Sequence, residues 1–252
     1  MKRAFTLSEI LITLGIIGVV TAITLPSLIM NYRKTVWVNQ LKSNYTILAN
    51  GFSQMTNREG NTSLAESETF LSLYGAGCGS NLPLSDGRCI NFYKNFKKFF
   101  KGNVQTIDNY KYSQEILNPN NKRNYSGNVF IMPNGAILFN YYFYPIGYIS
   151  AEYNQGHFYI DTNGFKGPNV YGRDIFYFAV ILEPPYIVAG GSKLCKETNC
   201  VDFPYWQECR GCCKSDSYAP MGFMHNTSCA GRIIDEGWKM NYWFLLFCLI
   251  KN

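Results

Sequence analysis

The chain has 252 residues, a length that allows one domain or two. Its formal net charge of +6 is too small to indicate nucleic-acid binding by itself. Only 16% of the residues are charged, whereas Tyr, Phe and Asn are abundant. We therefore expect a surface that is polar but weakly charged, which favours close packing against other protein surfaces.

The N-terminus joins a short basic leader to a long apolar segment. Lys2 and Arg3 precede a run of mostly apolar residues that reaches Ile29, and about 20 such residues suffice to span a bilayer. Glu9 lies near the start of this run. A carboxylate at membrane depth costs about 3 kcal/mol on insertion scales, so Glu9 is expected to meet a positively charged partner.

This N-terminus resembles that of the type IV prepilins and type II secretion pseudopilins. Family members have a short basic leader, a peptidase site that here falls between Ala4 and Phe5, a glutamate at the position of Glu9, and often a helix-bending proline at the position of Pro26. Two residues depart from the usual pattern, because Ala4 stands where Gly is usual and Ser8 where an apolar residue is usual.

The resemblance implies a role for each of these residues. A dedicated peptidase would cut after Ala4 and methylate the new N-terminus at Phe5. The subunits would then assemble into a filament, in which Glu9 of one subunit pairs with the Phe5 amine of its neighbour. Pro26 would bend the helix, because proline removes a helical hydrogen bond and clashes with the preceding turn.

Two simpler interpretations of the apolar segment remain open. It could be an ordinary secretory signal cut after Ala22, or a plain membrane anchor. Neither interpretation explains Glu9. The topology signal is mixed, because the basic leader favours a cytoplasmic N-terminus whereas Arg33 and Lys34 follow the other end of the segment.

Residues 5–56 are predicted to form one long helix. Residues 1–4 would be the leader, residues 5–29 the transmembrane or filament-core half, and residues 30–56 an amphipathic half. Spacings of three and four residues predict that one face of the amphipathic half packs on a head; this face consists of Val38, Leu41, Tyr45, Leu48, Phe52 and Met55.

Residues 57–252 are predicted to form a globular head outside the cytoplasm. We expect short helices at 64–74 and 90–101, a hairpin of strands 129–132 and 136–139, and a second strand pair at 157–161 and 175–180. Residues 184–230 are rich in Cys, Gly and Pro and are expected to be irregular. The predicted fold class is α+β, a long helix packed on an antiparallel sheet, and the pilin resemblance implies the same shape.

Nine cysteines indicate an oxidising compartment. Cys78 and Cys89 bracket a short loop with turn residues and are predicted to pair. The odd count leaves at least one thiol unpaired, and we favour Cys248. This residue lies in the apolar tail, residues 243–250, which is expected to be a buried last strand. The other disulfide candidates are Cys195, Cys200, Cys209, Cys212, Cys213 and Cys229. A zinc site formed by some of these with His225 is a less favoured alternative.

The loop of residues 161–174 is a candidate calcium site. Its oxygen-bearing side chains are Asp161, Asn163, Asn169 and Asp174, and calcium takes six to eight oxygen ligands. Some type II secretion pseudopilins bind calcium in the head, so the resemblance implies the same ion. The sequence is not an EF-hand loop, and the alternative is a loop whose Asp and Asn side chains bond their own backbone. No cofactor is predicted to be required.

Residues 93–101 alternate lysines with aromatic residues, a composition that can bind single-stranded nucleic acid. The favoured alternative is a short amphipathic helix with a solvated basic face. The chain has two histidines, His157 and His225, and neither has a recognisable nucleophile nearby in the sequence. We therefore expect no catalytic site and no enzyme activity.

The sequence favours a structural subunit of a type IV pilus or a type II secretion pseudopilus. Its expected location is the bacterial inner membrane, as a single-pass protein with the head outside the cytoplasm, and then a cell-surface or periplasmic filament. Expected partners are other pilin subunits, the prepilin peptidase, the inner-membrane assembly machinery and the lipid bilayer, with nucleic acid less favoured. The alternative is an anchored or secreted disulfide-stapled binding protein, either an adhesin or a DNA-binding minor pilin.

Overall fold

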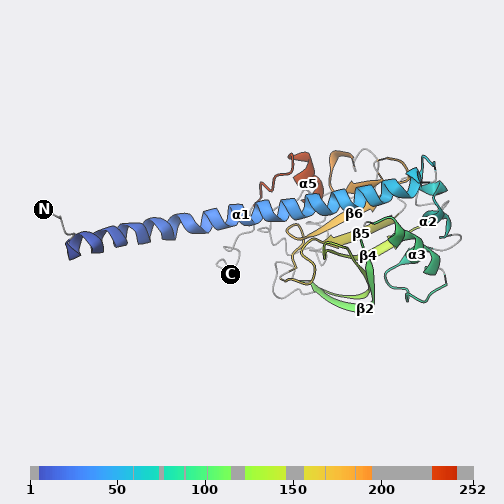
Figure 1. Ribbon diagram of the computed structural model, residues 1–252, viewed down its shortest axis with the longest axis horizontal. Coiled ribbons are helices and arrows are strands. Elements are labelled where there is room, and N and C mark those ends of the chain that lie inside the picture. Colours follow the sequence, from blue (N-terminus) through green and yellow to red (C-terminus); the bar gives the residue numbers. More distant parts are fainter. Residues whose placement is uncertain are drawn as a thin grey trace, which may run out of the picture.

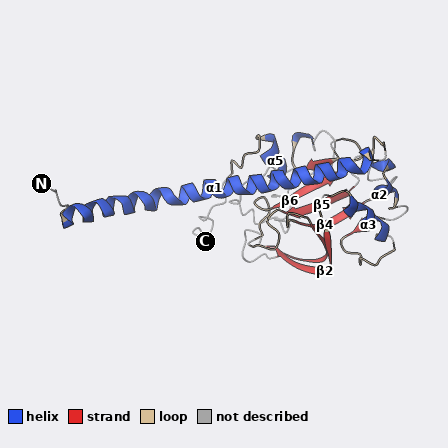
Figure 2. Ribbon diagram, in the orientation of Figure 1, coloured by secondary structure: helices blue, strands red, loops and turns tan. Residues whose placement is uncertain are grey.

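A computed structural model shows an α+β protein in which one long helix extends far beyond a compact head (Figure 1). The strands gather into a sheet that lies beside the second half of the long helix (Figure 2). The structure describes residues 6–58, 60–73, 77–87, 89–100, 102–114, 123–145, 156–167, 169–184, 186–194 and 229–242.

Helix α1 runs without interruption from Leu7 to Asn57, a length of about 75 Å. Pro26 lies inside the helix and does not end it. The predicted packing face is confirmed, because five of its six residues are buried and Tyr45 is half-buried; the buried five are Val38, Leu41, Leu48, Phe52 and Met55. The sequence period thus fixes which side of α1 meets the head.

The chain after α1 forms short elements that cover one end of the sheet (Figure 1). These are the 3₁₀ helix η1 (Leu64–Glu66), helix α2 (Glu68–Leu71), strand β1 (Cys78–Gly79) and helix α3 (Ile90–Lys98). Ser63 and Ser67 cap the first two helices by accepting hydrogen bonds from backbone amides. The predicted helices at 64–74 and 90–101 therefore exist but are shorter than expected.

The sheet is antiparallel throughout, in the order β2-β3-β4-β5-β6-β7, and β1 pairs with the far half of β4. The two predicted strand pairs are confirmed as β3–β4 and β5–β6. The strands are β2 (Gln105–Gln114), β3 (Arg123–Ile131), β4 (Ile137–Phe143), β5 (Gly156–Asp161), β6 (Ile175–Val180) and β7 (Ile187–Ala189).

The sequence-based prediction did not include strands β2 and β7. Strand β2 is rich in polar residues and carries a register irregularity between Ile107 and Tyr110, with Asn109 at φ 48°, so its apolar alternation is weak. Strand β7 has only three residues and lies in the segment that we expected to be irregular. Both strands form because a neighbouring strand supplies backbone hydrogen bonds. The local sequence pattern does not predict this pairing.

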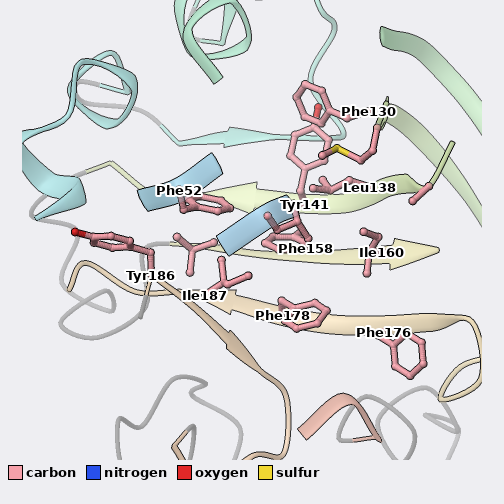
Figure 3. Packing of buried hydrophobic residues seen from close by; sticks show 14 of the residues in the cluster. Phe52, Phe130, Leu138, Tyr141, Phe158, Ile160, Phe176, Phe178, Tyr186 and Ile187 are labelled. Atoms are coloured by element: carbon pink, nitrogen blue, oxygen red, sulfur yellow. The ribbon is translucent and has the colours of Figure 1, made fainter. Parts of the chain in front are cut away.

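The core lies between α1 and one face of the sheet. Figure 3 shows Phe52 of α1 beside β4 and β5 among aromatic and aliphatic side chains. The ring of Phe52 stacks on Phe158 with centroids 6.2 Å apart, and it meets Phe96 of α3 at 5.9 Å. The opposite face of the sheet is also buried, at residues such as Phe139 and Tyr177, so β5 and β6 are shielded on both sides.

Two further connections tie the head together. A disulfide joins Cys78 of β1 to Cys89 at the start of α3, as predicted. Helix α5 (Cys229–Asp235) then packs beside β7, and Trp238, which follows it, meets Tyr45 of α1 with ring centroids 5.7 Å apart. The C-terminal part of the described chain therefore contacts α1 directly.

Candidate functional site

The first half of α1 is a bare apolar rod. The large apolar side chains from Leu7 to Ile29 are all exposed, with Leu7 76% and Ile23 73% accessible. An 18-residue window of this half has a mean hydropathy of 2.2 and none of it is buried. The exposed apolar stretch is about 35 Å long, close to the roughly 30 Å thickness of a bilayer's hydrocarbon core. By length and composition, α1 can span a membrane.

Glu9 lies in the first turn of this rod and is bonded to Thr6. The Glu9 Oε2 atom accepts hydrogen bonds from the Thr6 backbone nitrogen and from the Thr6 hydroxyl, both at 2.8 Å. In return, the Thr6 hydroxyl accepts from the Glu9 backbone nitrogen at 3.3 Å. This reciprocal arrangement is a capping box, which satisfies two backbone donors that a helix start otherwise leaves open.

The capping box leaves part of the Glu9 carboxylate for another partner. Within the described residues, Glu9 Oε1 accepts no hydrogen bond, and an ionised carboxylate offers about four acceptor positions. Sequence reasoning missed the role of Thr6. The signal was present, because a Thr followed three residues later by Glu, just before an apolar run, is the sequence pattern of a capping box. Ala4 and Phe5 lie outside the described residues.

Polar side chains within the rod are satisfied by the helix itself. The Thr13 hydroxyl donates to the Glu9 and Ile10 carbonyls at 2.9 Å, and the Thr24 hydroxyl donates to the Val20 carbonyl at 2.9 Å. Such bonds let a hydroxyl sit on an apolar surface without exposing an unpaired donor. By sequence, Glu9 carries the one ionisable side chain between Thr6 and Ile29.

A second candidate site is the loop between β5 and β6. Asp161 and Asp174 are fully buried there. The Asp161 Oδ1 atom accepts from the Asn163 backbone nitrogen at 3.0 Å, and the Asn163 side chain donates to Asp174 Oδ2 at 2.9 Å. Arg173 forms an ion pair with the same Asp174 oxygen at 2.8 Å. The structure thus brings three of the four predicted oxygen-bearing side chains together, while Asn169 is buried on the same loop.

Burial shifts the pKa values of both carboxyl groups upward. The pKa of Asp161 rises to about 8, chiefly through burial and then through the nearby Asp174 charge. The pKa of Asp174 rises to about 6, because burial outweighs the opposing effect of Arg173. Near neutral pH, Asp161 therefore holds a proton while Asp174 is mostly ionised.

We predict that stability falls as the pH rises from 6.5 to 8. Asp161 keeps its proton in the folded chain but loses it in the unfolded chain, so the folded state binds more protons in this range. The free energy of unfolding should then decrease by up to about 1.4 kcal/mol per pH unit. Urea denaturation of the full chain in detergent at pH 6.5, 7, 7.5 and 8 measures this slope.

Asp161→Asn is the matched variant for this test, and it should remove most of the slope. The window starts at pH 6.5 because burial also lowers the pKa of His157 to about 4. His157 gives the opposite slope, because the unfolded state gains a proton that the folded state excludes, and this slope fades as the pH rises through about 6.5, the ordinary pKa of histidine. An unchanged slope in Asp161→Asn would show that another group titrates.

Asp174 is poorly placed to bind a calcium ion. Calcium binds through oxygen atoms that point at it, but here both oxygens of Asp174 already accept hydrogen bonds. The Val170 amide bonds Oδ1, while Asn163 and Arg173 bond Oδ2. A cation at Oδ2 would face the positive charge of Arg173. In the described part of the chain, no group of three or more His, Cys, Asp or Glu side chains is placed to hold a metal.

The cysteine-rich segment lies largely outside the described residues. This is true of Cys195, Cys200, Cys209, Cys212 and Cys213, of His225, and of Cys248 in the apolar tail, so their pairing and the zinc alternative stay predictions. Cys229 is disulfide-bonded.

The basic and aromatic segment is an amphipathic helix, α3. Phe92, Tyr93 and Phe96 are buried in the core, and Lys94 and Lys98 point to the exposed side. The rings are therefore not accessible for stacking on bases, which removes one of the two interactions that single-strand binders use. The remaining basic face carries no specific indication of nucleic acid.

No family model, curated protein or solved structure matches the chain.

Proposed function

We propose that this chain is a pilin-like structural subunit of a bacterial type IV pilus or type II secretion pseudopilus. The main support is the placement of one carboxylate, Glu9, in the first turn of a bare apolar helix whose other half carries the head. A plain anchor explains the apolar length and the capping box, but it has no use for the Glu9 oxygen that the capping box leaves open.

In this proposal the chain first resides in the inner membrane. The basic leader stays in the cytoplasm, and the prepilin peptidase removes it by cutting between Ala4 and Phe5. The apolar half of α1 spans the lipid bilayer, and the head lies outside the cytoplasm. The capping box with Thr6 holds the Glu9 carboxylate in a defined position while the subunit is single.

The assembly machinery then moves the subunit into a filament, where the apolar halves of α1 bundle. The second oxygen of Glu9 receives the Phe5 amine of the neighbouring subunit. Because an unpaired charge in an apolar core is costly, only the register that joins these two groups avoids the penalty. The heads form the outer surface of the filament.

The mature N-terminus of the protein purified from its native cell tests this proposal. Mass spectrometry should find an N-terminal peptide that begins at N-methylated Phe5. A chain that begins at Ile23, after Ala22, would instead establish an ordinary secreted protein and would remove the filament role.

We predict that Ala4→Trp blocks processing, because a large side chain next to the cut would not fit the peptidase. The unprocessed chain should accumulate in the membrane and run as a larger band on a gel. Ala4→Gly is the matched control, since it restores the residue usual in the family and should be processed normally. Normal maturation of Ala4→Trp would place the cut elsewhere.

A further inference from the structure

The loop between β5 and β6 poses an electrostatic problem. Two carboxyl groups, Asp161 and Asp174, are fully buried in one loop, and a buried negative charge is strongly destabilising unless a positive charge or hydrogen bonds compensate it. In calcium-binding loops, the ion supplies that compensation. Here the compensating groups belong to the chain itself.

We infer that the guanidinium of Arg173 is the built-in counter-cation of this loop, which holds the loop together without a metal ion and fastens it to α1 through Trp37. The Arg173 Nη2 and Nε atoms lie 2.8 and 3.3 Å from Asp174 Oδ2. Its side chain is only 16% exposed, and Asp174 is not exposed at all. This inference does not depend on the proposed filament role.

The same guanidinium contacts the long helix. The Arg173 Cζ atom lies 5.3 Å from the centre of the Trp37 ring, within the range of a cation–π interaction. Trp37 directly precedes Val38, the first fully packed residue of α1. Arg173 therefore joins the loop to the helix at the point where the helix leaves the head. A planar guanidinium can bond a carboxylate and stack on a ring at once, which a lysine cannot do equally well.

The neighbouring residues of the loop are held from other directions. The Tyr242 hydroxyl donates to the Gly172 carbonyl, and the Thr162 amide and hydroxyl both donate to the Asp174 carbonyl. These hydrogen bonds hold the backbone on both sides of Arg173 independently of the Arg173 side chain. Charge compensation of Asp174 and the contact with Trp37 are contributions that the guanidinium adds to this backbone arrangement.

Thermal unfolding of the full chain in detergent measures the effect of Arg173. We expect Arg173→Gln to lower the Tm by about 10 °C, because Asp174 then stays buried without its counter-charge. Arg232→Gln is the matched control. Arg232 pairs with Glu236 at the same 2.8 Å, but both side chains are about one third exposed, so its loss should cost no more than about 3 °C. Equal shifts for the two variants would overturn the inference.

A second substitution separates charge from packing. In Arg173→Gln with Asp174→Asn, the buried charge is gone, and Asn163 can rotate so that its otherwise unpaired Oδ1 atom accepts from the new amide. We expect the double variant to regain more than half of the lost Tm. No recovery would mean that Arg173 does not act through the charge of Asp174 and would overturn the counter-cation role. If Arg173→Gln does not fold, Arg173→Lys replaces it, with a smaller expected loss because the charge remains.

Calcium tests the metal-free part of the inference on the unaltered protein. Extracellular calcium modules have Kd values of about 0.1–1 mM, so calcium at about 10 mM would raise the Tm of such a site by several degrees. We expect a change of less than about 1 °C on adding either calcium or a chelator. A rise of several degrees with calcium would overturn the inference.

Discussion

Glu9→Ala is expected to leave the leader cleaved but to prevent assembly. Cleavage should persist because the cut lies between Ala4 and Phe5, outside the capping box. Assembly should fail because the Phe5 amine of the neighbouring subunit would enter an apolar core without a counter-charge. Leaving one partner of a buried pair alone costs about 3–5 kcal/mol. This cost lowers the equilibrium constant for adding each subunit by a factor of more than about 100. Filaments sheared from the cell surface, compared with subunits left in the membrane, measure this effect.

Two neighbouring variants sharpen the test of Glu9. Ser8→Ala changes an exposed residue beside it and should assemble normally. Thr6→Val removes the hydroxyl that caps the helix but leaves the carboxylate, so it should cost only about 1 kcal/mol and reduce assembly less. If Glu9→Ala makes filaments in normal amounts, the pairing with Phe5 is wrong. If Thr6→Val is as defective as Glu9→Ala, the capping box rather than the pair is what assembly requires.

Phe52→Ala is expected to destabilise the head by about 3–5 kcal/mol. Phe52 is fully buried, and its ring meets Phe158 of the sheet, Phe96 of α3 and Phe70 of α2. Truncation would leave a cavity where these elements join α1, and dense packing limits how far they can close it. Urea denaturation of the full chain in detergent gives the free energy of unfolding.

A substitution in the exposed half of α1 is the control for this prediction. Ile12→Ala removes an apolar side chain from the exposed half of α1, where none of the described head residues buries it. Its unfolding midpoint should match that of the unaltered chain, and Phe52→Leu should fall between the two. A loss below about 1 kcal/mol for Phe52→Ala would contradict the packing of α1 on the sheet.

The basic helix α3 shows what tertiary packing adds to a reading of composition. From the sequence alone, alternating lysines and aromatic residues are compatible with nucleic-acid binding, but they favour an amphipathic helix with a solvated basic face. The helical period of α3 turns Phe92 and Phe96 into the core, where they stack with centroids 5.4 Å apart, and leaves Lys94 and Lys98 outside. The interpretation depends on which face is covered, and tertiary packing decides that.

The candidate calcium site in the loop between β5 and β6 likewise depends on tertiary packing. The sequence correctly placed Asp161, Asn163 and Asp174 in one loop before a strand. It suggested calcium because those residue types are calcium ligands. What it missed was that Arg173, the residue next to Asp174, turns its guanidinium onto Asp174 Oδ2 and Trp37. That orientation depends on the position of a helix far away in the sequence.

The sequence by itself determined the local features of this protein. The apolar run and the three- and four-residue period specify α1 and its packing face, and turn residues between apolar strands specify the β3–β4 hairpin. The Thr6–Glu9 capping box is equally local. Only the tertiary structure decided the short strands β1 and β7, the irregular strand β2, and the partner of Arg173. These features are stabilised by contacts between distant segments, and no periodicity within a segment encodes such contacts.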